Sequence, residues 1–290
     1  MTGRLLYRVA ALGAVAAFAF TAATAQASML YDQAVLDLDA IGYWKLDGNA
    51  DDSSGNAHHG SATNITWLTD GPDPAAPGAG RGDGSSGVVH VDNHSDLMPE
   101  GPMSVVAWTR RDGASGSTGG SQEMPAIASV NDRGWILRYG GGGWGTGANA
   151  SGAPRFDGRE SDGTVIWDPE NDLDDIWDNQ WHMIAGVYDR DEQEMRLYVN
   201  GELAHTETAS GAALASDMTA DMTIFASYSD ADGGTLQRFL DGDISRVSLH
   251  DRVLSDADVA NLYAAIPEPG TLGLLAAGSL LLMRRRARRQ

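Results

Sequence analysis

Oxygen-bearing side chains crowd one short stretch near the start of the chain, residues 47–56. Its candidate donors include three aspartates, a serine and an asparagine in a polar, glycine-containing segment: Asp47, Asp51, Asp52, Ser53 and Asn56. Calcium takes about six to eight oxygen ligands from carboxylates, amides and main-chain carbonyls. The density of donors therefore predicts a calcium site. The same residue types also build ordinary turns, so a solvated turn is the alternative.

Two further acidic stretches, residues 168–178 and 191–194, raise the question of catalysis. Glycosidases place two carboxyl groups on either side of the glycosidic bond. In the first stretch Glu170 follows a proline, and the apolar alternation of a strand is missing. The second stretch, which ends at Glu194, falls where a hairpin turn is expected. We interpret both as loops and predict no catalytic residue.

Tryptophans in loops are the candidates for contact with a sugar. Trp144 lies in a glycine-rich run, and Trp167 and Trp177 flank the first of those acidic stretches. An exposed indole offers a flat apolar face for a sugar ring, and neighbouring Asp and Asn side chains can bond its hydroxyls. The alternative is that each ring folds back onto the core of the domain.

Two adjacent histidines, His58 and His59, follow the candidate calcium ligands. Imidazole suits zinc or copper better than calcium. Neighbouring side chains on an extended chain point in opposite directions, so the pair predicts an exposed loop rather than a metal site.

The composition excludes several classes of chemistry. The chain has no cysteine, which rules out a disulfide framework, a thiolate nucleophile and a cysteine-ligated zinc ion. Its formal net charge is -20, and arginines concentrate in the two terminal segments, so the part between them is more acidic still. Such a charge repels nucleic acid and attracts cations. We therefore expect no nucleic-acid partner.

The first 27 residues have the three parts of a secretory signal peptide. A positively charged start is followed by an apolar run and by the small-residue site Ala25-Gln26-Ala27. The pattern predicts export with cleavage after Ala27, and an uncleaved membrane anchor is the alternative.

The last 25 residues carry a second targeting pattern. The apolar run at residues 271–283 is shorter than the roughly 20 residues of a spanning helix, but a cluster of arginines follows it directly. Pro267 and Pro269 break any helix that leads into the run. The pattern predicts a marginal or cleavable anchor, with contact to the membrane through this segment alone.

Pro267-Glu268-Pro269, the apolar run and the arginine-rich end together resemble the PEP-CTERM sorting signal of Gram-negative bacteria. The resemblance implies that an exosortase-type protease is a partner and that residues 266–290 are a sorting signal. The chain would be held briefly at the inner membrane, and its body then delivered to the cell surface or extracellular matrix.

The body, residues 28–265, is predicted to be one β domain. Short alternating runs predict strands at residues 87–91, 103–109, 135–139, 183–188, 195–199 and 244–249. Asn200-Gly201 predicts a two-residue hairpin turn. Helices are expected at residues 30–39 and after Ser255, where Asp258 completes a capping box. Many short strands are typical of a sandwich or barrel.

Several motifs along the body resemble those of laminin-G-like, concanavalin A-like jelly rolls. They occur in family order at residues 42–60, 104–108, 181–182, 198–203 and 239–257. The resemblance implies an all-β, concanavalin A-like jelly-roll β-sandwich with short flanking helices. It also implies that Trp44, Trp108 and Trp181 belong to the core.

One departure from the family pattern concerns the closing strand, which usually carries an acidic pair after its isoleucine. Here Ser245 and Arg246 stand in those places, and Asp243 precedes Ile244. If the strand completes a metal site in relatives, this chain must use Asp243 or do without. We therefore add Asp243 to the predicted calcium ligands.

The sequence thus predicts an exported, surface-sorted, non-catalytic module that binds a polysaccharide or another extracellular polymer, with Ca2+ as its candidate cofactor. Two other functions stay open. One is a polysaccharide-degrading enzyme of the same fold, and the other is a structural or adhesion protein of the extracellular matrix.

Overall fold

The computed structural model describes residues 30–74, 76–111, 124–130, 134–140, 152–160, 162–167, 173–217, 219–229 and 234–266. The signal peptide predicted at residues 1–27 lies outside these ranges. The sorting motif Pro267-Glu268-Pro269 and the apolar run behind it also lie outside, so both targeting signals stay predictions.

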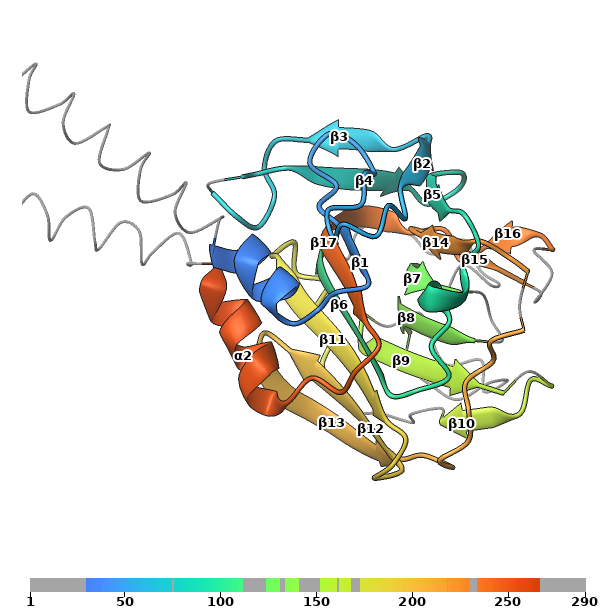
Figure 1. Ribbon diagram of the computed structural model, residues 1–290. Helices are drawn as coiled ribbons and strands as arrows, with labels where there is room; N and C mark the ends of the chain where they lie inside the picture. The colour runs from blue at the N-terminus through green and yellow to red at the C-terminus, as the bar shows by residue number, and fades with distance from the viewer. Residues whose placement is uncertain are drawn as a thin grey trace, which may run out of the picture.

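Within the described ranges, antiparallel strands form two facing sheets (Figure 1). The first sheet runs in the order β13 (Glu202–Thr208), β12 (Glu194–Val199), β11 (His182–Asp189), β6 (Met103–Arg110), β17 (Asp241–His250), β4 (Ala79–Asp83), β3 (Thr66–Leu68), with β1 (Gly42–Trp44) also paired to β17. The second runs in the order β10 (Val165–Trp167), β9 (Pro154–Arg159), β8 (Trp135–Tyr139), β7 (Ala126–Ser129), β14 (Met222–Ile224), β5 (Val88–Val91), β2 (Gly60–Thr63). A small hairpin joins β15 (Ser227–Tyr228) to β16 (Leu236–Gln237).

The central strands of the first sheet are buried on both faces. In β6, Val105 and Ala107 point into the core between the sheets, whereas Val106 and Trp108 point into a second core on the outer side. Strand β11 alternates in the same way. This double burial explains why both strands read as nearly continuous apolar runs in the sequence.

The outer core is closed by the helical residues 30–37 and by α2 (Asp256–Ala265), which lie side by side against the first sheet (Figure 1). Helix α2 begins at Ser255, whose hydroxyl accepts from the Asp258 N–H while the Asp258 carboxylate accepts from the Ser255 N–H. The predicted capping box is therefore confirmed. No helix in the described part of the chain is both long and apolar enough to cross a membrane.

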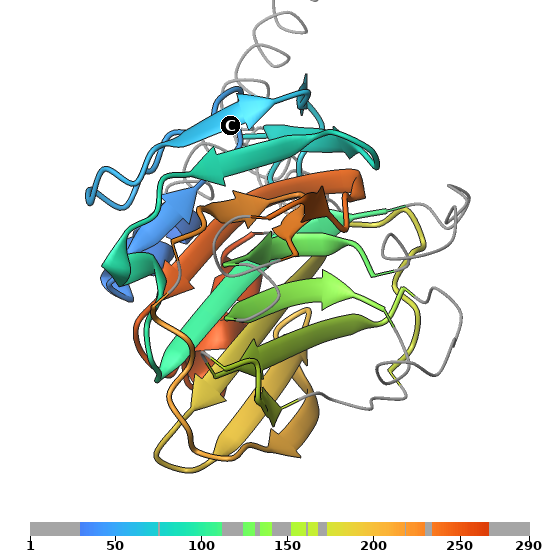
Figure 2. The same cartoon turned by 90° about the vertical axis from the view of Figure 1, so that its right-hand side faces the viewer.

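The strand predictions are confirmed at all six runs, and the hairpin between β12 and β13 is confirmed as well. Asn200 and Gly201 have φ angles of 52° and 82°, the left-handed conformation that a type I′ turn requires. The second sheet faces the viewer in Figure 2, with the first sheet behind it. The architecture is the all-β sandwich with short flanking helices that the sequence predicts.

The last residue of β17, His250, is a buried neutral imidazole. Its Nδ1 lies 3.1 Å from the Leu38 carbonyl oxygen, and its Nε2 lies 3.1 Å from the Ser248 hydroxyl. The tautomer with the proton on Nδ1 satisfies both contacts, since Nδ1 then donates to the carbonyl and Nε2 accepts from the hydroxyl. Burial lowers the pKa of His250 to about 4.

This imidazole should make the protein less stable in mild acid. Between about pH 6.5 and pH 4 the unfolded chain binds a proton on His250 that the folded protein does not, so stability falls as pH falls through this window. The His250 contribution amounts to about 3 kcal/mol. Urea unfolding at pH 7, 5.5 and 4.5 should show a shallower pH slope for His250→Gln than for the wild type. Equal slopes would contradict the assignment.

Candidate functional site

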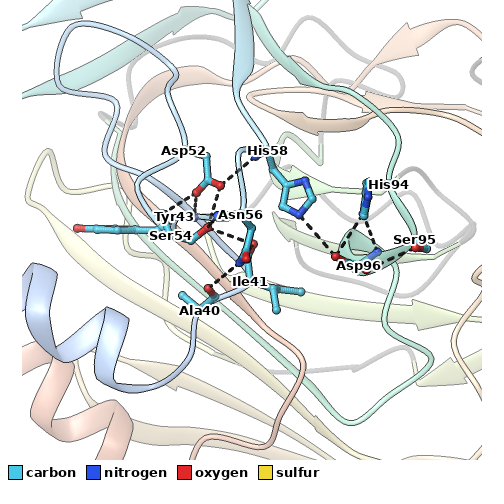
Figure 3. Close-up of polar contacts among 10 residues, drawn as sticks. All are labelled: Ala40, Ile41, Tyr43, Asp52, Ser54, Asn56, His58, His94, Ser95 and Asp96. Atoms are coloured by element: carbon cyan, nitrogen blue, oxygen red, sulfur yellow. Dashed lines mark hydrogen bonds and ion pairs between the residues drawn. The ribbon is translucent and has the colours of Figure 1, made fainter.

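The Asp52 carboxylate organises the loop that the sequence predicts to bind calcium (Figure 3). Its Oδ1 accepts from the backbone N–H groups of Tyr43 and Ser54, at 2.9 and 2.8 Å. Its Oδ2 accepts from the Ser54 hydroxyl at 2.8 Å and from the His58 N–H at 3.0 Å. A carboxylate offers about four lone-pair positions. All of them face donors of the protein itself, and the residue is 8% exposed.

The other predicted ligands of the loop do not gather around Asp52. Asp47 and Asp51 are exposed, and the backbone N–H of Asp51 donates to the Asn49 side chain. The amide nitrogen of Asn56 donates to the Ile41 carbonyl oxygen at 3.0 Å. The loop is therefore held by internal hydrogen bonds, and calcium binding there stays a prediction.

The structure places Asp243 away from that loop, in an ion-pair cluster. On β17, Asp243 lies directly opposite Arg81 of β4 and Arg110 of β6. Its carboxylate is 2% exposed, lies 3.0 Å from Arg81 Nη1 and accepts from Arg110 Nε at 2.8 Å. Asp52 is bridged to Trp44, which pairs with Val247 of β17. Val247 comes four residues after Asp243, which corresponds to roughly 13 Å along a strand. Asp243 and Asp52 are not brought together.

At Ser245 and Arg246, where the sequence analysis notes a departure from the family pattern, β17 carries a buried cation. A bulge in β17 gives Arg246 a φ of 52°. Its Nη2 donates to Asp73 Oδ2 at 3.0 Å and to the Ala76 carbonyl oxygen at 3.0 Å. Both charged side chains are 1% exposed. This part of the closing strand holds an ion pair between Arg246 and Asp73.

The three predicted sugar-contacting tryptophans have different outcomes. Trp144 lies outside the described residues, and of Trp167 the structure describes only the backbone, at the end of β10. Trp177 is half-buried against the core. The Arg111 guanidinium lies 3.8 Å from the centre of its ring, and the Tyr139 ring meets it edge-on at 5.8 Å. Trp177 thus supports the sandwich as well as bordering the surface.

Trp181 packs against the outer core, as predicted, but it is less buried than the other two tryptophans of the family motifs. Unlike Trp44 and Trp108, which are buried as predicted, Trp181 is only partly buried. Its indole N–H donates to the Asp70 carbonyl oxygen at 3.1 Å, and the Arg110 guanidinium lies 4.8 Å from the ring centre. The position before β11 explains the exposure, because the ring lies at the rim of the sheet and not within it.

We call Arg110, Trp177, Asp178, Gln180 and Trp181, which lie at the end of β6 and in the segment that leads into β11, the tryptophan edge. Trp177 packs against the core between the sheets, and Trp181 packs against the outer core. Asp178 and Gln180 are exposed and lie between the two indoles in sequence. Asp178 Oδ1 accepts from the Gln180 N–H at 2.8 Å and lies 3.0 Å from His182 Nε2. A partly buried indole near a fixed carboxylate and an exposed amide is a combination that can bind a sugar, through its apolar face and its hydroxyls.

The charges at the tryptophan edge are held in their ionised forms. Burial alone would lower the pKa of Arg110, but hydrogen bonds to Asp243 and Asp70 raise it above the usual arginine value. Burial alone would raise the pKa of Asp178, but the hydrogen bonds from His182 and from the Gln180 N–H lower it. The edge therefore presents a fixed cation and a fixed anion at neutral pH.

A second group of charged side chains lies on β8 and β9 of the second sheet. Arg138 donates to Asp157, and Arg155 approaches the other oxygen of the same carboxylate at 3.7 Å. Burial lowers the pKa of Arg138. All three residues are at most 3% exposed. A ligand in solution cannot reach them, which leaves the tryptophan edge as the better candidate.

The acidic stretches considered for catalysis do not form a carboxylate pair on a strand in the described residues. Asp191 and Glu192 are exposed on the turn between β11 and β12, as predicted. Glu194 opens β12 and lies 3.4 Å from Arg196. Glu170 lies outside the described residues.

With the fold and the candidate surface established, the class of protein follows. The chain is a laminin-G-like β-sandwich, and the family model of the concanavalin A-like lectin/glucanases superfamily matches residues 83–260. That match covers more than half of the chain, so the chain belongs to this superfamily. No protein of curated function matches the sequence.

Solved structures with the same fold include binding domains of toxins and one domain of an enzyme. The binding domain of Paraclostridial Mosquitocidal Protein 1 has a TM-score of 0.55 and 13% identity, over 79% of this chain and 52% of that chain. Domain 4 of AbnA, a GH43 extracellular arabinanase from Geobacillus stearothermophilus in complex with arabinotriose, has a TM-score of 0.52 and 15% identity, over 78% and 98%. The binding domain of botulinum neurotoxin DC in complex with SialylT has a TM-score of 0.52 and 15% identity, over 80% and 52%.

Similarity at these identities establishes the fold alone. The chain spans about half the length of the toxin binding domains that it matches, and nearly the whole length of the arabinanase domain. The activities of those proteins are therefore properties of the relatives.

Proposed function

We propose that this protein is a non-catalytic glycan-binding module that acts outside the cell. The observation that carries the proposal is the tryptophan edge, where the partly buried Trp181 indole lies 4.8 Å from the Arg110 guanidinium and follows the exposed Asp178 and Gln180 in the chain. Asp178 is fixed by hydrogen bonds with His182 and with the Gln180 backbone N–H. Membership of the lectin/glucanase superfamily supports the same function. Two of the similar structures, domain 4 of AbnA and the neurotoxin binding domain, carry glycans.

Delivery outside the cell is the second part of the proposal. It is supported by the signal-peptide pattern of residues 1–27 and by the sorting motif at Pro267-Glu268-Pro269. The body would reach the surface or matrix after an exosortase-type protease removes the tail. There it would meet surface glycans and extracellular polysaccharide.

The direct test measures binding and product formation in one experiment. The protein is incubated with arabino-oligosaccharides, sialylated oligosaccharides and a panel of bacterial exopolysaccharides, with calcium and with EDTA. Retention of a glycan without shortened products would support the proposal. Released oligosaccharides would show an enzyme, and failure to retain any glycan would favour the structural or adhesion role.

Binding should depend on the tryptophan edge. We expect Trp181→Ala to weaken the affinity for a retained glycan at least tenfold, which is about 1.4 kcal/mol, because the sugar loses its flat apolar contact. Isothermal titration calorimetry measures the loss. Gln180→Ala, on the exposed part of the edge, should weaken binding without altering the fold. Gln33→Ala, at an exposed position of the helical segment 30–37, is its matched control. Equal affinities for Gln180→Ala, Trp181→Ala and the control would show that the tryptophan edge does not bind the glycan.

A further inference from the structure

His58 is held in a fixed position beside the Asp52 loop. Its backbone N–H donates to Asp52 Oδ2 at 3.0 Å, and its carbonyl oxygen accepts from the Trp44 indole N–H at 2.8 Å. Trp44 is fully buried, so both anchors belong to rigid parts of the sandwich. The two adjacent histidines have different partners: His59 Nδ1 accepts from the Asp52 N–H, whereas the His58 ring lies beside His94 and Asp96. The prediction of an exposed loop is wrong for His58, whose side chain is only 8% exposed.

The His58 ring faces a turn from a distant part of the chain (Figure 3). His94 caps the short 3-10 helix η1 (Ser95–Leu97), and the His94 and His58 ring centres lie 4.7 Å apart. Asp96 is the second residue of η1, and its Oδ2 lies 3.4 Å from His94 Nδ1 and 3.9 Å from His58 Nε2. Two loops, 45–59 and 92–102, thus bring two imidazoles and a carboxylate to one point.

The buried nitrogen at this point has no hydrogen-bond partner among the described residues. His58 Nε2 is inaccessible to solvent and makes no hydrogen bond. His94 Nδ1 accepts a long hydrogen bond of 3.3 Å from the Asp96 N–H, so its lone pair points toward Asp96 rather than away. Three electron-pair donors therefore converge within 4.8 Å of one another. A buried polar atom without a partner is costly, and a cation at the centre would remove that cost.

We propose that His58, His94 and Asp96 form a binding site for a divalent transition metal of the zinc class. A tetrahedral zinc ion with bonds of about 2.0–2.1 Å holds its ligand atoms about 3.4 Å apart. The spacings of 3.4 and 3.9 Å to the Asp96 oxygen come close to that geometry, and small rotations of the exposed His94 and Asp96 side chains can complete it. The metal would replace the long hydrogen bond to His94 Nδ1.

The ligand types select the metal. Two imidazole nitrogens and one carboxylate suit zinc, copper or nickel, whereas calcium requires oxygen ligands. His94 and Asp96 are 51% and 57% exposed, so a fourth position is open to water or to a donor atom of a bound molecule. This site is separate from the calcium ligands predicted in the sequence.

Binding of zinc would cross-link the two loops. The pairing of Gly60 with Val91 joins the two loops at their bases. A metal bound further out would add a second link, so it should raise the midpoint of thermal unfolding by several degrees at saturating concentration. A shift of this kind reads out metal binding without any assumption about glycans.

The experiment titrates the metal-free protein with ZnCl2 by calorimetry, and with CoCl2 by visible absorption, whose intense bands report tetrahedral coordination. We expect one ion per chain, a raised unfolding midpoint and no such response to CaCl2. His58→Gln and Asp96→Asn should each weaken zinc binding at least tenfold. Asp96→Asn changes an exposed side chain, so it tests the proposal even where His58→Gln fails to fold.

The matched control is His205→Gln on β13. His205 Nε2 lies 3.2 Å from Glu207, and among the described residues no third ligand joins this imidazole and carboxylate. The control should bind zinc as the wild type does. Absence of binding in the wild type, or binding that survives both His58→Gln and Asp96→Asn, would overturn the proposal.

Discussion

Replacing Asp73 with asparagine is expected to destabilise the protein by about 3–5 kcal/mol, because the substitution leaves a buried guanidinium without its counter-charge. Arg246 and Asp73 are both 1% exposed, and the Nη2–Oδ2 distance is 3.0 Å. For a domain of this size the loss corresponds to a fall of about 6–20 °C in the unfolding midpoint.

The course of β17 fixes Arg246 in a position where its side chain reaches Asp73. The bulge after Ser245 turns the strand so that Arg246 donates its backbone N–H to the Lys45 carbonyl oxygen while its side chain reaches the segment around Asp73. The guanidinium cannot swing into solvent without breaking that strand. A bulge often re-aims one side chain in this way.

Thermal unfolding followed by circular dichroism measures the effect, and the ion pair between Arg252 and Asp39 provides the control. Those side chains are 45% and 86% exposed and lie 3.7 Å apart, so Asp39→Asn should change stability by less than about 1 kcal/mol. The double variant Asp73→Asn/Arg246→Met should recover part of the loss, because no charge then stays buried. Equal midpoints for Asp73→Asn and Asp39→Asn would show that the pair contributes little.

The sequence predicts the parts of the fold whose pattern is local. The runs at β6 and β11 are apolar enough to be recognised alone, and Ser255 and Asp258 carry the capping signal within four residues. The strands that the sequence analysis does not predict lack such a local pattern. Strand β4, Ala79–Asp83, contains two glycines and two charged residues, and β9 begins at Pro154. Their strand conformation is imposed by pairing with neighbours distant in sequence.

The candidate sites are harder to predict from the sequence than the strands, because they depend on contacts between distant residues. Residue types identify Asp52 as a potential metal ligand, but they do not reveal that backbone N–H groups of Tyr43, Ser54 and His58 already occupy its oxygens. The environment of His58 depends on His94 and Asp96, which arrive from another loop. A motif that names a ligand type cannot say which partners the fold supplies.

Asp52→Asn is expected to destabilise the protein by about 2–4 kcal/mol, with or without calcium. The substitution keeps the shape of the side chain but replaces one acceptor oxygen with an NH2 group. If that group takes the place of Oδ2, it faces the His58 N–H; if it takes the place of Oδ1, it faces the N–H groups of Tyr43 and Ser54. In either orientation a buried donor loses its acceptor, at about 1–3 kcal/mol for each donor, and the charge that strengthens the remaining bonds is lost.

Asp51→Asn is the matched control, because Asp51 is the adjacent aspartate and is exposed. It should change the unfolding midpoint by no more than about 1–2 °C. Both variants and the wild type are unfolded thermally in calcium and in EDTA. If the Asp52 carboxylate acts only through its hydrogen bonds, the difference in unfolding midpoint between wild type and Asp52→Asn should be the same in both buffers. If the difference in unfolding midpoint between wild type and Asp52→Asn disappears in EDTA, the carboxylate stabilises the protein by binding calcium. The role of Asp52 would then be that of a calcium ligand and not that of a hydrogen-bonded anchor of the loop.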